Sequence, residues 1–212
     1  MMRQTFSAAL IMTASAFCLA SSAAAAVDPK NPDWPCVQRK VENLSPAAIW
    51  DGPSIDEHKD WFRAEKVPAL VTKLASRRVP LEKALAAVDE FAQTVPEADR
   101  DVVLTKLFAG LFDTVNTQRR SIISGIEKYQ RSQQARAEEL EKQGVDLANL
   151  KGGIVIDDTS AVPESEEEQK LYWAGRIFQE RQANIPIACE LPALLEERLF
   201  AVKQHIRSKM SK

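Results

Sequence analysis

Two cysteines offer the clearest chemistry in this sequence. Of the three in the chain, Cys18 lies in an apolar N-terminal stretch that we predict to be cleaved off as a signal peptide. Its loss leaves Cys36 and Cys189 as an even pair. A redox or metal site is disfavoured, because neither cysteine has a second one two residues away. We therefore predict a disulfide between Cys36 and Cys189. It would close most of the chain into one loop, and the loop-entropy relation gives about 5 kcal/mol for such a closure.

Metal and haem chemistry find little support in the sequence. The chain has two histidines, His58 and His205, and neither has the His-Glu-x-x-His or Glu-x-x-His spacing of metal sites. The Cys-x-x-Cys-His motif of covalent haem attachment is absent. Met210, a further possible haem ligand, stands close to a chain end, where residues are normally frayed. We expect no metal and no cofactor, and interpret both histidines as packing or surface residues.

Motifs of covalent and phosphoryl chemistry are also missing. There is no Gly-x-Ser-x-Gly elbow, and Lys151-Gly152-Gly153 lacks the spacing of a phosphate-binding loop. Acidic residues are plentiful, but Asp157-Asp158 and Glu166-Glu167-Glu168 are not arranged as a calcium-binding loop. A solvated loop and the negatively charged start of a helix explain them better. An enzyme is therefore the less favoured interpretation.

Basic residues and tryptophans form a candidate partner surface. The basic residues fall on a long predicted helix: Arg119, Arg120, Lys128, Arg131 and Arg136. Glutamates interleave with them, so ion pairing along a solvated helix is the plainer alternative. The tryptophans cluster near the start of the mature chain: Trp34, Trp50 and Trp61. They would contact a partner or stack on a sugar if exposed together, whereas burial is the favoured alternative.

The N-terminus has the pattern of a signal peptide over residues 1–26. Arg3 precedes an apolar run, and Ala24-Ala25-Ala26 provides a small-residue cleavage site. The run is too short for a membrane span of roughly 20 residues, and the bulky Phe17 before Cys18 disfavours a lipoprotein. We predict a periplasmic or secreted protein, cleaved near Ala26, with no transmembrane helix after cleavage.

Charge excludes one class of partner. The formal net charge is −2 at pH 7, and loss of Arg3 with the leader makes it one unit more negative. Such a near-neutral chain has no electrostatic footprint for nucleic acid, and export makes that partner still less suitable.

The first half of the mature chain is predicted to consist of short helices behind an arm. Residues 27–53 form this proline-rich arm, in which Ser45-Pro46 begins a short helix through Trp50. Ser54 with Glu57 has the capping-box spacing and predicts a helix to about Lys66. Further helices are expected after Pro68 and Pro80.

One long helix dominates the middle of the sequence, from about residue 96 to residue 143. This range lacks proline after Pro96, and apolar residues recur in a three-four repeat typical of helix and coiled-coil packing. The first half is apolar and belongs in the core, whereas the polar second half should project. Gly110 and Gly125 would admit a close neighbour or mark a kink. Gly144 is a plausible C-cap.

The final third is predicted to contain a loop and two helices. The loop covers about residues 151–163, the glutamates after it begin a helix to about Gln182, and the last helix starts after Pro192. Pro35, Pro186 and Pro192 predict that both cysteines lie on stiff non-helical segments. The fold class is an all-α bundle over residues 54–212, with the arm crosslinked to the C-terminal helix region.

These features favour a non-enzymatic exported protein, an accessory or scaffold subunit that binds another protein of the cell envelope. A homo-oligomer is a further possibility. The alternative is a module that binds a small ligand or saccharide, or a hydrolase, with a pocket between the arm and the bundle. The two hypotheses predict different structures: a closed core with a protruding helix for the first, and a concave pocket with converging ionisable and tryptophan side chains for the second.

Overall fold

The computed structural model describes residues 31–151 and 165–211, without the side chains of residues 147–151. The described part is all-α and has no strand, which confirms the predicted fold class. The predicted signal peptide and its predicted cleavage site lie outside the described residues, as does the range 152–164, which includes most of the predicted loop. Within them the elements run in the order α1 (Pro46–Ile49), α2 (Val67–Ala75), α3 (Leu81–Thr94), α4 (Arg100–Lys151), α5 (Glu166–Ala183) and α6 (Ile185–Ser208), with three short 3-10 helices at Asp56–His58, Trp61–Arg63 and Glu97–Asp99.

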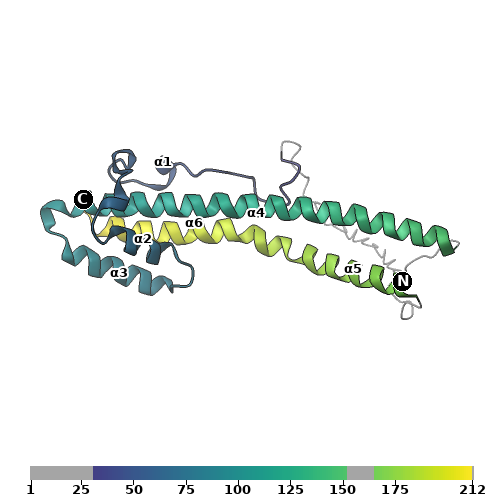
Figure 1. Cartoon of the computed structure of the whole chain (residues 1–212). Coiled ribbons are helices and arrows are strands. Elements are labelled where there is room, and N and C mark those ends of the chain that lie inside the picture. Colours follow the sequence, from purple (N-terminus) through teal and green to yellow (C-terminus); the bar gives the residue numbers. More distant parts are fainter. Residues whose placement is uncertain (1–30, 152–164, 212) are drawn as a thin grey trace, which may run out of the picture.

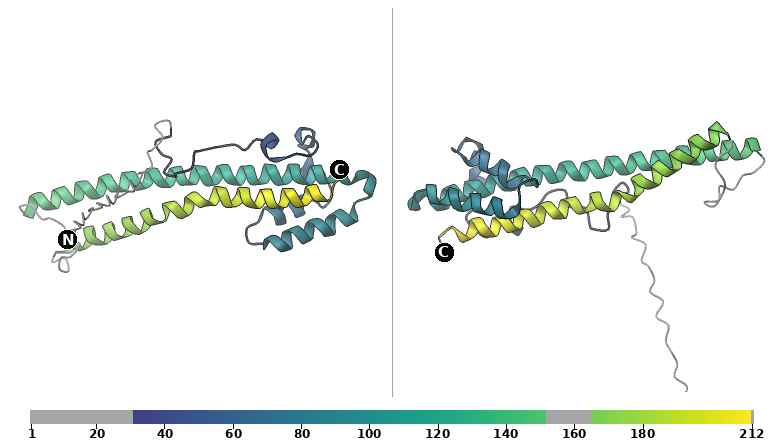
Figure 2. Two further views of the ribbon diagram at one scale, coloured as in Figure 1. Left: turned by 180° about the vertical axis from the view of Figure 1, so that it is seen from behind. Right: turned by 90° about the horizontal axis from the view of Figure 1, so that it is seen from below.

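The long helix α4 is the axis of the molecule. It runs antiparallel to α5 and α6, which lie end to end along it, while α2 and α3 pack at one end and the arm runs along its side (Figure 1). The molecule is therefore elongated, and Figure 2 shows α4 and α5 extending away from the end that holds α2 and α3. We call residues 127–151 of α4 together with α5 the stalk. The base comprises residues 54–126 and α6.

The main core lies in the base. Its fully buried side chains come from α2, α3, the first turns of α4 and the second half of α6, among them Leu74, Val88, Leu104, Phe108, Leu199 and Ile206. Alternating spacings of three and four residues place these side chains on one stripe of each helix, and the stripes meet in the core. Four helices at one end of the molecule thus share one apolar interior.

The single helix predicted over residues 54–66 does not form. Residues 54–66 form two 3-10 turns instead of one helix, because the Ser54 hydroxyl accepts a bond from the Asp56 amide, two residues on, and no capping box forms. This local bond competes with helix formation. Lys66 then adopts a left-handed conformation with φ 65°, unusual for a residue other than glycine, and α2 begins directly after it.

The last helix begins at Ile185 and includes Pro192, so the prediction of a start after Pro192 is wrong. Cys189 consequently lies on a helix and not on a non-helical segment. Proline within a helix removes a backbone hydrogen bond and costs about 3 kcal/mol. Here the buried stripe keeps its helical period across the proline, with Cys189, Pro192 and Leu195 all buried. Burial along this stripe offsets the lost bond.

The long helix is displaced from its predicted range. It begins at Arg100, after a 3-10 turn at Glu97–Asp99, and it continues through Gly144 to Lys151, so Gly144 is not its C-cap. Gly110 has a packing role, because a Cβ there would lie 2.7 Å from the Trp61 ring and 2.8 Å from Val71. Gly125 has no described atom within 4 Å of such a Cβ, so close approach does not explain it.

Candidate partner-binding surface

The arm is tied to the bundle by Cys36 and Cys189. The structure places the two cysteines at disulfide distance, with their Cα atoms 5.5 Å apart and a sequence separation of 153. The predicted pairing is confirmed at this level. The Gln38 amide donates a hydrogen bond to the backbone oxygen of Cys189, which adds a polar contact beside the crosslink.

Trp34 anchors the start of the arm. Its ring is buried in a small apolar cluster with Ile123 and Ile126 of α4. Its indole nitrogen donates a hydrogen bond to the backbone oxygen of Gln38 at 2.7 Å. Burial of the large ring with its single polar group satisfied follows the usual behaviour of tryptophan. The Trp34 ring is therefore buried, as the burial alternative predicts.

Trp50 and Trp61 also serve the core. Trp50 stacks on Phe108 with ring centroids 4.0 Å apart and donates from its indole nitrogen to the Pro53 oxygen at 2.6 Å. Trp61 is half-buried and packs over Gly110. The three tryptophans therefore do not form one exposed platform.

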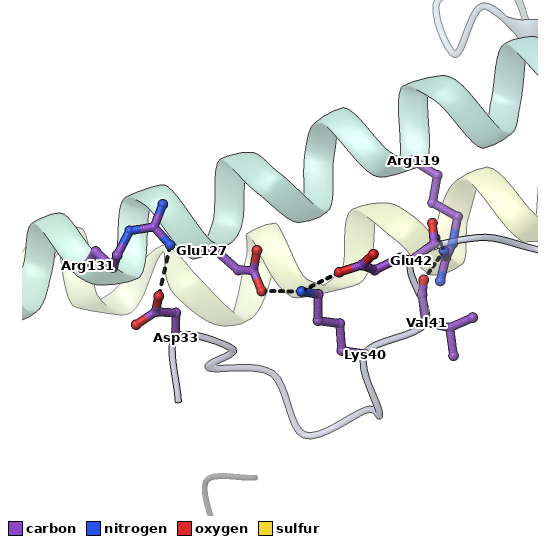
Figure 3. A network of polar contacts seen from close by, with 7 residues as sticks. All are labelled: Asp33, Lys40, Val41, Glu42, Arg119, Glu127 and Arg131. Carbon is purple, nitrogen blue, oxygen red and sulfur yellow. Dashed lines mark hydrogen bonds and ion pairs between the residues drawn. The ribbon is translucent and has the colours of Figure 1, made fainter. Parts of the chain in front are cut away.

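Arg119 is the most buried of the predicted basic residues. Only 5% of it is exposed, its Nε lies 2.5 Å from a Glu196 carboxylate oxygen, and its guanidinium donates to the backbone oxygen of Val41. Arg119 of α4 thus contacts α6 through Glu196 and the arm through Val41, and Figure 3 shows the contact with Val41. Charge-assisted bonds to a main-chain oxygen and a carboxylate are stronger than neutral ones. Arg119 therefore joins the arm to α4 and α6.

Further ion pairs continue this network along the arm. Lys40 lies 2.6 Å from Glu127 and 2.8 Å from Glu42, and Arg131 lies 2.9 Å from Asp33 (Figure 3). Hydrogen bonds to Glu127 and Glu42 raise the pKa of Lys40, and the bond from Lys40 lowers the pKa of Glu42. The arm is thus held to α4 by alternating charges, in addition to the crosslink and Trp34.

The remaining predicted basic residues are more open to solvent. Arg120 bonds to Asn43 and Thr117, and Arg136 pairs with Glu139 three residues on, as the solvated-helix alternative predicted. Lys128 is exposed at the start of the stalk. Three of the basic residues therefore contact the arm, namely Arg119, Arg120 and Arg131, whereas on the stalk Lys128 is exposed and Arg136 is partly exposed.

Exposed apolar side chains on α5 were not singled out from the sequence. Trp173 is 62% exposed, Ile177 is 47% exposed, and Tyr172 makes an edge contact with Trp173 at 5.4 Å. The available signal was the spacing of Trp173 and Ile177, four residues apart in an otherwise polar helix. A Ser165–Glu168 capping box, also missed, begins this helix and fixes its position.

Two shallow hollows test the ligand-binding alternative. One, of about 240 Å³, lies between the arm and α6, lined by residues 35–38 with Ile185, Pro186, Cys189 and Glu190. It contains no aromatic side chain and one carboxylate. The other, of about 680 Å³, is lined by Arg77, Arg78 and neutral residues of α4 and α6. Neither combines tryptophan with converging ionisable groups.

Ionisable groups of the base form structural pairs. His205 lies 2.9 Å from Asp89, which also pairs with Lys209 at 2.7 Å, and Lys203 pairs with Asp51 at 2.8 Å. Hydrogen bonds from Lys209 and then His205 lower the pKa of Asp89, and a bond from Lys203 lowers that of Asp51. Among the described residues, no group of three or more His, Cys, Asp or Glu could hold a metal ion.

Comparison with known proteins gives no relative of this chain. No protein family model matches the chain, and no curated protein or solved structure shows significant similarity to it. None of the helices in the described ranges is both long enough and apolar enough to cross a membrane. Any functional conclusion must therefore come from the stalk, the braced arm and the exposed side chains.

Proposed function

We propose that this chain is an exported, non-enzymatic scaffold or accessory subunit whose stalk binds another protein of the cell envelope. The observation that carries the proposal is the extension of α4 beyond the core. Past Ile126, α4 continues to Lys151. The arm contacts this part at Glu127 and Arg131, and α5 lies along it (Figure 1). An extended two-helix element beyond the core suits a docking role.

The braces at the root of the stalk support the same conclusion. The crosslink, the buried Trp34 and the Arg119 network all join the arm to α4 or α6 near residues 119–131. Several independent contacts at this place limit bending of α4 against the base. A firmly mounted stalk loses less conformational freedom on binding than a loose one, which favours its use as a scaffold.

Export is supported by the leader pattern and the cysteine pair together. The first 26 residues have the order of a signal peptide, and two distant cysteines lie at disulfide distance. Disulfides persist in oxidising compartments outside the cytosol. A partner in the same compartment follows from this location.

The test is recovery of a partner from the native envelope with the tagged mature chain. We expect the chain to begin at Val27 and to co-purify with one envelope protein. Lys128→Glu combined with Arg136→Glu, both on the stalk, should lower the recovery at least about tenfold, because exposed charges set the encounter and orientation of partners. Arg78→Glu in the base is the matched control and should have no effect.

Two results would contradict the proposal. One is a mature chain that still carries residue 1 and remains in the cytosol. The other is a chain that recovers no protein from the envelope but binds a saccharide or small metabolite, which would favour the alternative of a ligand-binding module.

A further inference from the structure

Helix α5 carries exposed apolar side chains on the side turned away from α4. Trp173, Ile177 and Tyr172 are 62%, 47% and 44% exposed. The residues of the opposite face, Leu171, Ala174 and Phe178, are partly covered, since that face lies against α4. All residues of α5 are described, and none of its side chains is fully buried. Its outward face therefore has no partner within the described chain.

Helical spacing places charges beside these apolar residues. Lys170, Trp173, Ile177 and Glu180 follow one another at three- and four-residue steps, so they share the outward face. All four are exposed. The order along this face is therefore positive, apolar, apolar, negative.

The order of charges on this face is complementary to that of a second α5 running in the opposite direction. In an antiparallel pair centred near Gly175, Trp173 lies opposite Ile177 of a second copy, and Lys170 lies opposite Glu180. The same register brings Gln169 opposite Arg181 and Glu166 opposite Asn184, so no like charges meet. Each contact occurs twice, as a two-fold interface requires.

We propose that α5 is a self-association surface that pairs two copies of this chain antiparallel, with the two-fold axis near Gly175. The pairing buries Trp173 and Ile177 of both copies and leaves each α4 on the far side of its own α5. The inference goes beyond the envelope partner and does not depend on it.

Other occupants fit the charges less well. A parallel pair would set Lys170 opposite Lys170 and Glu180 opposite Glu180, which is repulsive. An anionic lipid surface would meet the acidic residues at the start of α5, Glu166, Glu167 and Glu168. The antiparallel copy is the one arrangement of these three in which each charge meets an opposite or neutral group.

The size of the surface sets the expected affinity. α5 has 18 residues, and a helix of that length spans about 27 Å. An interface between two such helices lies at the small end of the known range, where complexes are weak or transient. We therefore expect a dimer in the micromolar range, visible as a change of mass with concentration.

The experiment is sedimentation of the purified, oxidised mature chain over roughly 1 µM to 1 mM. The wild-type chain should convert from monomer to dimer. Lys170→Glu and Glu180→Lys, each alone, should weaken the dimer at least about tenfold, because two ion pairs become two repulsions. An equimolar mixture of the two variants should recover the dimer, since both cross-pairs are again of opposite charge.

The mixture separates association from folding. Lys170 also pairs with Glu166 within α5 at 2.8 Å, so Lys170→Glu alone affects the helix as well as the dimer. A folding defect would persist in the mixture, whereas a lost contact between copies would be restored. Lys83→Glu, on the exposed face of α3, is the charge control and should leave the dimer unchanged.

A second variant tests the apolar contact. Trp173→Ser should abolish the dimer, and Phe200→Ser, at a similarly exposed aromatic of α6, should not. A chain that is monomeric at every concentration would overturn the inference, as would a mixture that fails to recover. Both results come from purified protein, so they leave the test of the envelope partner independent.

Discussion

The base and the stalk share helix α4 but bury very different side chains. In the base, α4 contributes Leu104, Leu107, Phe108 and Leu111 to the core. In the stalk, within the described ranges, the one buried side chain is Gln133, whose Oε1 has no hydrogen-bond partner. The base is therefore stabilised by apolar burial, and the stalk by its attachment to the base.

This difference teaches that continuity of a helix does not imply continuity of a core. Most helix stability in proteins comes from tertiary packing, not from intrinsic propensity. Four helices and the arm supply that packing in the base, whereas the stalk has two helices. We therefore expect the stalk to have a lower local stability than the base.

The largest expected effect is the loss of stability when the core of the base is altered. Phe108→Ala removes a fully buried ring that stacks on Trp50, and we expect a loss of about 3–5 kcal/mol in the free energy of unfolding. Phe178→Ala, the matched change in the half-buried seam of the stalk, should cost about 1 kcal/mol. Chemical denaturation of the oxidised chain measures both. Equal losses would show that the stalk has a core comparable to that of the base.

The second prediction concerns the crosslink between the two regions. Replacing Cys36 and Cys189 together by alanine should cost about 2–5 kcal/mol, because the unfolded chain regains the freedom of a long loop. A reductant should lower the thermal midpoint of the wild-type chain and leave that of the double variant unchanged. A wild-type midpoint that does not respond to reductant would contradict a structural disulfide.

The smallest expected effect tests whether Arg119 holds the arm against the bundle. Arg119→Met leaves Glu196 without its buried partner and removes the bond to the Val41 oxygen, so we expect a loss of about 2 kcal/mol. Arg120→Met, one residue on and exposed, should change stability by less than about 0.5 kcal/mol. Thermal unfolding with protease digestion of the arm measures both. Equal effects would mean that Arg119 does not hold the arm.

Several features of the base followed from local pattern. The three-four spacing of apolar residues predicted α3 and the apolar half of α4, and Pro46 and Pro68 stand at helix starts as expected. The cysteine pair followed from counting, because the predicted loss of the leader with Cys18 leaves two cysteines and one pairing within the chain. Each of these inferences depends on neighbours in sequence or on composition alone.

The helix predicted over residues 54–66 failed because of a local bond between Ser54 and Asp56, whereas other errors occurred where distant contacts overruled local signals. Pro192 marks a helix start by local rules, but burial against α4 carries α6 through it. The basic residues of α4 were similar in sequence, yet Arg119 is buried beneath the arm and Lys128 is exposed, because helix rotation sets which side chain faces residues 41 and 42. Trp173, alone in the sequence, proved more exposed than the three clustered tryptophans for the same reason.

The sequence by itself determined the fold class, the cysteine pair and the existence of a long helix with an apolar and a polar half. These depend on periodicity and residue count, which the chain carries without reference to its fold. Only the tertiary structure decided which face of each helix is covered and which basic and aromatic side chains remain free. That outcome depends on how helices rotate and pack against segments up to 153 residues away, and no local pattern encodes such contacts.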